Sequence, residues 1–246
     1  MIPYERQERI LEILKEKKLV KIDELSEILN DVSVSTLRRD IKELEKNGKV
    51  ESMYGGAVKY LLNTDELPIT KKSLIHMKEK EVIADLAAGL VHDGETVYID
   101  SGSTATLLMD KLIRKDITIY TTNTSIFTKV LEDMKAEVII LSGTFNSVTF
   151  SLSGPFTELS LQNIYFDQAF LGVNGVDIVT GASTPNISEA VKKKLVRDHS
   201  RHTYLLCDSS KFGLTANVKA FDINGITIIS DKKDEDLAEV AEFVTP

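Results

Sequence analysis

Apolar residues recur at helical spacing through the first part of the chain. Their spacing of three and four predicts a helix over about residues 3–17, a second helix after Asp23 and a third after Ser33. Asp23 and Ser33 are the expected N-caps, because a short side-chain oxygen can accept a hydrogen bond from the first helical turn. Gly48 is expected to end the third helix, because glycine tolerates the left-handed conformation found at helix ends.

The stretches around these helices have the pattern of short strands. Residues 20–22 form a brief extended piece, and residues 50–58 predict a β-hairpin that turns near Tyr54, Gly55 and Gly56. The order helix, strand, helix, turn, helix, hairpin is typical of a winged helix-turn-helix. We therefore assign residues 1–58 to such a domain.

The pattern changes after this domain. Residues 59–76 lack a clear period and are interpreted as a linker, with a short helical start left open. From residue 77 to 246, apolar strands alternate with helices, which predicts a mostly parallel α/β sheet covered on both faces. Helices are expected over about residues 78–91, 103–113, 125–134, 158–161, 188–198 and 235–243. Strands are expected over about residues 96–99, 117–121, 138–141, 168–173, 204–207 and 226–229.

The charge is divided unevenly along the chain. The protein has 246 residues with 30 Lys and Arg against 38 Asp and Glu, a net charge of -8. Residues 1–60 hold 12 basic and 12 acidic side chains, so the whole excess lies in the remainder. This balance disfavours a histone-like coat of positive charge, but a local basic patch can still bind nucleic acid.

Composition also bounds the environment of the protein. Cys207 is the single cysteine, which excludes an internal disulfide and a Cys-rich metal site, and its apolar neighbours indicate a buried strand thiol. Charged residues occupy the first ten positions where a signal peptide needs an apolar core. No stretch reaches the roughly 18 apolar residues that span a bilayer. We expect a cytoplasmic protein without a membrane partner.

The third predicted helix carries a candidate nucleic-acid surface. If Leu37, Ile41 and Leu44 face the core, hydroxyls and basic groups project from the other side. Small hydroxyls at a helix start can approach phosphate, and an arginine fork can grip guanine or phosphate. A solvated helix face is the plainer alternative. The candidate DNA-contacting residues are Ser33, Ser35, Thr36, Arg38, Arg39, Lys42 and, in the hairpin, Tyr54.

Residues 32–48, with their Thr36-Leu37-Arg38-Arg39-Asp40 core, resemble the recognition helix of the DeoR family of bacterial transcriptional regulators. The family's Gly-Gly-Ala follows at 55–57. The resemblance implies binding to double-stranded operator DNA. One departure concerns the wing, where Glu51, Ser52 and Tyr54 replace the family's usual Arg and His. We therefore expect weaker wing contacts, with more of the binding left to the helix.

A candidate anion site lies in the second part of the chain. Residues 100–104 join a predicted strand to a helix start, where backbone N–H groups, hydroxyls and the helix dipole can hold an anion. A plain connector is the alternative. Other loops follow the carboxyl ends of strands, where open α/β sheets bind ligands. The candidates from these loops are Asp100, Ser101, Gly102, Ser103, Thr104, Thr122, Asn123, Asn174 and Gly175.

Most of residues 75–230 resemble the sensor domain of the same family, which is similar to the ribose-5-phosphate isomerase/CoA-transferase fold. The resemblance implies a phosphorylated sugar as effector. Glu189 resembles the start of the family's Glu-Ala-x-x-Lys helix, which points to Lys193, with Lys192 as second choice. Residues 208–213 resemble the family's Asp-x-Ser-Lys-Phe-Gly loop and add Lys211; a local acid pairing with Lys211 is the alternative.

No catalytic residue, metal site or cofactor is predicted. His199 and His202 lack acidic or Cys partners at ligand spacing. A rival hypothesis is a sugar-phosphate isomerase or transferase-like enzyme with an added N-terminal module. The isomerase relatives use an Asp-Gly-Ala-Asp segment, whereas Asn174 stands first here, and an amide cannot act as a base.

The leading hypothesis is a homodimeric or homotetrameric repressor of a sugar-utilisation operon, controlled by a phosphorylated sugar. A sensor that acts through a protein partner is a third possibility, kept open by the unusual wing.

Overall fold

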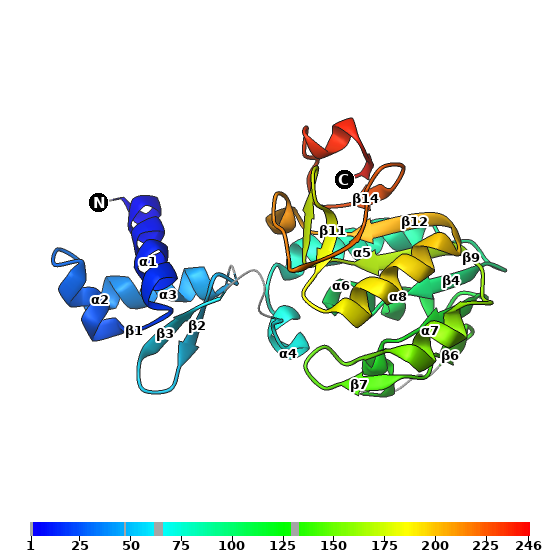
Figure 1. Ribbon diagram of the computed structural model, residues 1–246, viewed down its shortest axis with the longest axis horizontal. Helices are drawn as coiled ribbons and strands as arrows, with labels where there is room; N and C mark the ends of the chain where they lie inside the picture. The colour runs from blue at the N-terminus through cyan, green and yellow to red at the C-terminus, as the bar shows by residue number, and fades with distance from the viewer. Residues whose placement is uncertain (1, 47, 62–65, 129–132) are drawn as a thin grey trace. The chain divides into compact units, whose positions relative to one another are not determined.

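The computed structural model describes residues 2–46, 48–61, 66–128 and 133–246. The chain forms two compact units, which are described separately (Figure 1). The first comprises Met1–Asp65 with Leu74–His76, and the second comprises Glu66–Ser73 with Met77–Pro246. The segment interpreted as a linker is thus shared by the two units.

The first unit is a winged helix-turn-helix. Its three-stranded antiparallel sheet has the order β1-β3-β2, with Leu19 opposite Lys59 and Val50 opposite Tyr60. Leu37, Ile41 and Leu44 are buried, as their spacing predicted. The elements are α1 (Pro3–Lys17), β1 (Leu19–Lys21), α2 (Ile22–Ile28), α3 (Val34–Lys46), β2 (Val50–Met53) and β3 (Ala57–Tyr60).

Two expected helix starts differ in outcome. The hydroxyl of Ser33 accepts a hydrogen bond from the backbone N–H of Thr36 at 3.2 Å, as expected of an N-cap. Asp23 is not a cap, because α2 begins at Ile22 and its N-cap position is Lys21, two residues earlier than expected. Asp23 instead lies in the first turn, where its negative charge favours the positive end of the helix dipole.

The second unit is a mostly parallel α/β domain. Its helical elements are α4 (Ile69–Lys72), α5 (Met77–Gly89), α6 (Ser103–Leu112), η1 (Thr124–Thr128), α7 (Pro155–Leu161), α8 (Ile187–Asp198), η2 (Ser209–Lys211) and η3 (Leu237–Glu239). Its strands are β4 (Thr96–Ile99), β5 (Thr118–Thr121), β6 (Glu137–Ile140), β7 (Thr144–Asn146), β8 (Ser151–Ser153), β9 (Phe166–Gly172), β10 (Gly175–Asp177), β11 (Gly181–Thr184), β12 (Ser200–Leu206), β13 (Val218–Phe221), β14 (Thr227–Ile229) and β15 (Glu242–Val244).

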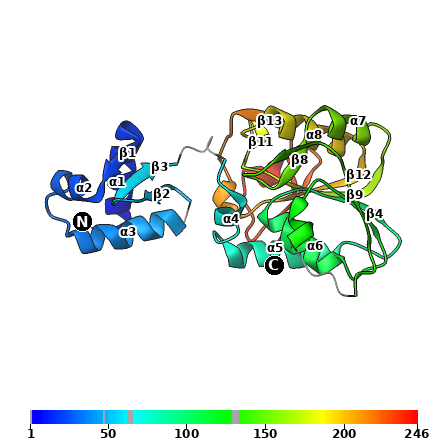
Figure 2. The same ribbon diagram turned by 90° about the horizontal axis from the view of Figure 1, so that it is seen from below.

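A seven-stranded sheet forms the centre of this unit. Its order is β15-β14-β12-β9-β4-β5-β6, and every neighbouring pair is parallel. Helices α5 and α6 cover one face, and α7 and α8 cover the other (Figure 2). Along β4, Val97 and Ile99 pack with α5 and α6, whereas Tyr98 packs on the opposite side. Both faces are therefore buried, as the apolar strands predicted. Cys207 is fully buried after β12.

Three expectations differ from the structure in the described residues. Where a helix was expected over 125–134, the structure has the short 3-10 turn Thr124–Thr128, and residues 129–132 lie outside the described part of the chain. Hydrogen bonds tighten this turn: the side chain of Asn123 accepts from Ser125 N at 2.9 Å, and Thr124 donates to Phe150 O. Side-chain contacts of this kind compete with regular helix.

The chain near 235–243 also departs from the expected helix. Leu237 and Ala241 are buried at a spacing of four, which mimics a helix. The structure instead has η3 followed by β15, in which Phe243 lies opposite Ile228 of β14.

Residues 175–177, expected in a loop, form β10 of the antiparallel sheet β10-β11-β13.

Gly181 begins β11 at a close backbone approach. Its φ is +73°, and an added Cβ would lie 2.4 Å from the carbonyl oxygen of Phe221. We expect Gly181→Ala to lower the free energy of unfolding by about 1–3 kcal/mol more than Gly225→Ala. Gly225 is the matched control, because it has φ +72° and open space around its Cβ position. Urea denaturation followed by circular dichroism measures both variants, and equal losses would contradict the close approach.

Candidate functional site

The solvent-facing side of α3 carries the predicted DNA-contacting residues. Arg38, Arg39 and Lys42 are exposed, while the neighbouring Leu37 and Ile41 are buried in the core. At the start of the helix the hydroxyl of Ser33 lies 2.9 Å from those of both Ser35 and Thr36. This surface thus combines a cluster of hydroxyl groups with adjacent basic groups, and both kinds of group can contact the phosphates of a nucleic-acid backbone.

Asp40 has a structural role in this unit. Its side chain is buried and forms an ion pair with Arg6 of α1, whose Nη2 donates to Oδ1 at 3.0 Å. The hydrogen bond to Asp40 raises the pKa of the Arg6 guanidinium. The Arg-Arg-Asp core therefore divides into two exposed arginines and one buried carboxylate that joins α3 to α1. Sequence spacing did not indicate Arg6, because 34 residues separate the partners.

The wing is attached to the recognition helix. Glu45 of α3 accepts hydrogen bonds from the backbone N–H of Ser52 at 2.8 Å and from its hydroxyl at 3.1 Å. Tyr54 lies fully exposed in the turn between β2 and β3. Gly55 and Gly56 both have positive φ angles in this turn. The ring of Tyr54 is therefore free to contact a partner.

The second unit has a pocket at the carboxyl ends of its central strands. The loops after β4, β9 and β12 all contribute to it, which is where open parallel sheets place ligands. Eight of the predicted effector residues line this pocket, namely Ser101, Gly102, Ser103, Thr104, Asn174, Glu189, Lys193 and Lys211.

Four other predicted residues lie outside the lining. Asp100 and Thr122 are buried and bond to lysines of α8. Asn123 is buried, and its amide donates to the hydroxyl of Thr106 at 2.8 Å. Gly175 approaches the backbone of Leu214, so that an added Cβ would lie 2.2 Å from its carbonyl oxygen. These residues support the walls of the pocket.

A buried network of four charges adjoins the pocket, and two of its members, Glu189 and Lys193, line it. Asp100 forms ion pairs with Lys193 and, at 3.7 Å, with Lys192. Both lysines follow Glu189 by about one turn of α8. Oε2 of Glu189 therefore lies 2.9 Å from Nζ of Lys192 and 3.8 Å from Nζ of Lys193. Both lysines named by the sequence therefore belong to the network, and Lys193 also lines the pocket.

Three members of the network have further hydrogen bonds. Asp100 accepts from Gly172 N at 3.1 Å, and Glu189 accepts from the hydroxyl of Ser151 at 2.9 Å. Lys192 donates to the hydroxyl of Thr122 at 3.1 Å. Burial alone would raise the pKa of Asp100, but the charges of Lys193 and Lys192 hold it below its ordinary value. Asp100 is therefore ionised at neutral pH.

Lys211 lies in the η2 turn and forms an ion pair with Asp208 at 3.3 Å. Burial alone would lower the pKa of Lys211, but the Asp208 carboxylate raises it above its ordinary value. The hydroxyl of Ser210 also donates to Asp208. Lys211 thus pairs with a local acid and lines the pocket at the same time.

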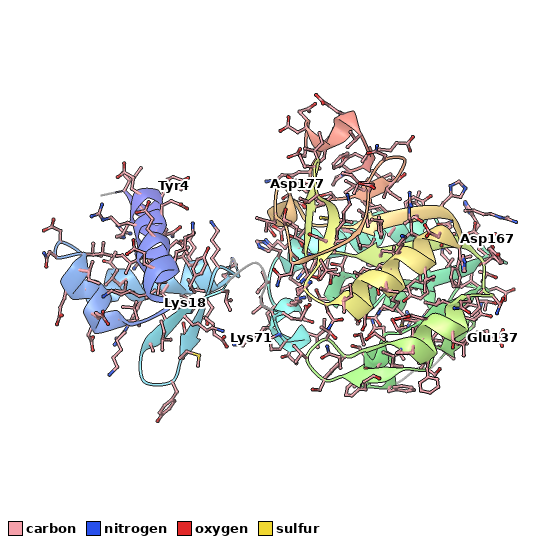
Figure 3. The ribbon with its side chains drawn as sticks, viewed as in Figure 1. Tyr4, Lys18, Lys71, Glu137, Asp167 and Asp177 are labelled. Atoms are coloured by element: carbon pink, nitrogen blue, oxygen red, sulfur yellow. The ribbon has the colours of Figure 1, made fainter. Side chains whose placement is uncertain are left out.

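Sequence reasoning missed the part of the pocket that comes from the segment before α5. Glu66, Ile69 and Lys72 line the pocket, and all three fall in the stretch interpreted as a linker. Lys71, beside them on α4, is labelled in Figure 3. The apolar Ile69 directly after Pro68 was a signal of an ordered, packed turn. Thr149, Val173 and Thr184 complete parts of the wall.

Asp177 and His199 have local roles. Asp177, labelled in Figure 3, accepts hydrogen bonds from Val179 N and Thr180 N, each at 2.9 Å, and these backbone bonds lower its pKa. His199 contacts the carbonyl oxygen of Leu161 through Nδ1 at 2.8 Å. Across the described residues, no cluster of His, Cys, Asp or Glu is suited to holding a metal ion. Every described helix is too short or too polar to span a membrane.

Comparison with known families accounts for both units. The DeoR-like helix-turn-helix domain matches residues 6–60, and the DeoR C-terminal sensor domain matches residues 75–232. The protein belongs to the DeoR family. The sequence resemblance is thereby confirmed for both parts of the chain.

Other regulators resemble this DeoR-family protein along nearly their whole length. The uncharacterized HTH-type transcriptional regulator FruR of Bacillus subtilis is 31% identical over 96% of this chain and 93% of its own. The HTH-type transcriptional regulator GlpR of Haloferax volcanii is 33% identical over 93% and 89%. The HTH-type transcriptional regulator GolR of Listeria innocua is 30% identical over 95% and 92%. The protein is therefore a DNA-binding transcriptional regulator with a sensor domain.

Solved structures give more distant similarities. Ribose 5-phosphate isomerase A of Methanocaldococcus jannaschii is 20% identical, with a TM-score of 0.40 over 55% of this chain and 54% of its own. Translation initiation factor eIF-2B of Pyrococcus horikoshii is 15% identical, with a TM-score of 0.41 over 87% and 74%. Similarities at this level carry no activity over to this DeoR-family regulator.

The buried network generates a stability prediction. We expect Asp100→Asn to cost about 3–5 kcal/mol of unfolding free energy at pH 7, because two buried lysines then share only Glu189. Since the folded pKa of Asp100 is lowered, its contribution is present above the unfolded value and disappears as pH falls through the folded one. The difference between wild type and variant should therefore shrink below about pH 4.

Urea denaturation across pH measures this difference. Asp85→Asn is the control, because Asp85 forms an exposed ion pair with Lys111. An Asp100→Asn variant as stable at pH 7 as the Asp85→Asn variant would contradict the role given to the network.

Proposed function

We propose that this DeoR-family regulator is a repressor of a sugar-utilisation operon whose operator binding is controlled by a phosphorylated sugar. The observation that carries the proposal is the composition of the pocket. The turn of residues 101–104 opens helix α6, and the pocket around it is also lined by Lys72, Lys193 and Lys211. Hydroxyls, backbone N–H groups and ammonium groups are the donors that bind a phosphate dianion.

The same pocket has groups suited to the sugar part of such a ligand. Asn174 is partly exposed, and its amide can donate to and accept from hydroxyls. Glu189 and Thr184 add acceptors to the lining. A ligand with one phosphate and several hydroxyls therefore matches the pocket better than a neutral sugar, because charge-assisted hydrogen bonds are roughly twice as strong as neutral ones.

Control of transcription requires that the sensor acts on an operator-bound DNA-binding unit. We propose that Ser33, Ser35, Thr36, Arg38, Arg39 and Lys42 contact the operator, with Tyr54 in an accessory role. A homodimer or homotetramer would present two recognition helices to two half-sites, which is the usual arrangement for helix-turn-helix proteins. A repressor of this kind acts by occupying the operator.

The chemistry of the pocket argues against the enzyme alternative. Asn174 is an amide and cannot abstract a proton. The carboxylate of Asp177 accepts hydrogen bonds from two backbone N–H groups, and Asp177 is not part of the pocket lining. The remaining carboxylates near the pocket are paired with lysines. An isomerase would need a free base, and these observations favour binding without turnover.

The DNA contacts can be tested by removing single charges. We expect Arg38→Ala and Arg39→Ala each to weaken binding by about 1–3 kcal/mol, at a duplex selected from random sequences by the full-length protein. Arg9→Ala is the matched control, because Arg9 is an exposed arginine on α1. Fluorescence anisotropy at several salt concentrations measures the loss. If both variants bind like the control, the recognition surface is assigned wrongly.

The effector proposal can be tested with pairs of sugars and sugar phosphates. We expect pentose and hexose phosphates to be the compounds that raise the melting temperature, since a ligand of the native state stabilises it by mass action. Lys211→Ala should abolish this shift, whereas Lys219→Ala, at an exposed lysine paired with Asp222, should keep it. Operator binding without ligand should persist in both variants.

Two outcomes would contradict the effector proposal. Tighter binding of an unphosphorylated sugar than of its phosphate would contradict the assignment of a phosphate site. Interconversion of any sugar phosphate by the protein, followed by NMR, would restore the enzyme alternative.

A further inference from the structure

Each lysine that lines the pocket or belongs to the buried network is already paired with a carboxylate. Lys192 and Lys193 pair with Asp100 and Glu189, and Lys211 pairs with Asp208. Lys72 pairs with Glu66, and both of these side chains line the pocket. Four positive and four negative groups therefore cancel. A paired ammonium group still has donors to offer, but a phosphate dianion gains most at a lysine whose carboxylate partner can leave.

Three of the four carboxylates are held by other bonds. Asp100 also accepts from Gly172 N, Glu189 from the Ser151 hydroxyl and Asp208 from the Ser210 hydroxyl. They are at most 8% exposed. Displacing any of them would leave a buried charge without compensation, which is strongly unfavourable.

Glu66 is different in each of these respects. Its side chain is 21% exposed, and within the described part of the chain its hydrogen bond goes to Lys72. Ile69 is buried, and its backbone N–H donates to Val148 O at 2.8 Å, which fastens α4 to the sensor unit. Glu66 lies before this anchor, on the side of the chain that leads to the DNA-binding unit. It can turn into solvent without breaking the backbone bond of the anchor, and Lys72 is then left open to another anion.

The surroundings of Lys72 favour an anion. Burial lowers the pKa of Lys72, and Lys211 and Lys193 lower it further against the opposing effect of Glu66. Three ammonium groups thus influence one another around the same pocket. A phosphate oxygen at this position would contact Lys72 and lie in the field of the other two.

We propose that Glu66 is a built-in competitor that occupies the anion subsite at Lys72, and that the phosphate of the effector displaces it. The inference rests on the proposed function, because it assigns the phosphate contact within the same pocket. Effector binding then releases the carboxylate of the segment that joins the sensor to the DNA-binding unit. Through this exchange of anions, ligand binding in the pocket changes the contacts of the joining segment.

The test measures the binding of inorganic phosphate and of a panel of pentose and hexose phosphates to the full chain by calorimetry. Glu66→Gln keeps the size of the side chain and removes its charge, and we expect it to bind these probes at least about threefold more tightly. Lys72→Gln should weaken binding by about tenfold or more. Glu137→Gln, at an exposed glutamate labelled in Figure 3, removes the same net charge outside the pocket and should leave the affinity unchanged.

A second measurement uses the wild-type protein. A Glu-specific protease should cut after Glu66 faster when the pocket is filled by the probe that binds best, and mass spectrometry identifies the fragment. Equal affinities in Glu66→Gln and Glu137→Gln, with binding in wild type intact, would overturn the competitor proposal and leave the proposed function standing. Absence of binding by wild type and all variants would overturn both.

Discussion

The buried ion network of Asp100, Glu189, Lys192 and Lys193 is the interaction on which the sensor unit depends. It joins the end of β4 to the first turns of α8, two elements far apart in sequence. Because isolated buried charges are costly, these four groups can be inside the protein only together. Their mutual positions fix the floor of the pocket, and Lys193 extends from that floor into the pocket wall.

The DNA-binding unit uses the same principle on a smaller scale. The pair of Asp40 and Arg6 holds α3 against α1, so that Arg38 and Arg39 project from a helix with a fixed orientation. In both units a buried pair of charges positions exposed or pocket-lining groups. Residues of one chemical type therefore divide by location into those that hold the fold and those that can meet a ligand.

Much of this arrangement could be predicted from local sequence. Periodicity identified the buried face of α3 and hence its exposed arginines, and the strand-helix turn at 101–104 identified the pocket wall. What local sequence could not supply was long-range pairing. The partner of Asp40 is 34 residues away, and Lys193 meets Asp100 across 93 residues. The contribution of Glu66 and Lys72 was hidden because a four-residue helix is too short to show a period. The edge strand β15 was mistaken for a helix because two buried residues stood four apart.

The hydrogen bonds from Ser52 to Glu45 have a consequence for how operators can differ. They fasten the hairpin to α3, so a change in the spacing between these two elements would break both bonds. In the operator complex proposed above, the hairpin is therefore held at a set distance from the helix along the duplex. New operator preferences would then arise more readily from replacing side chains on α3 and the hairpin than from moving the two elements apart.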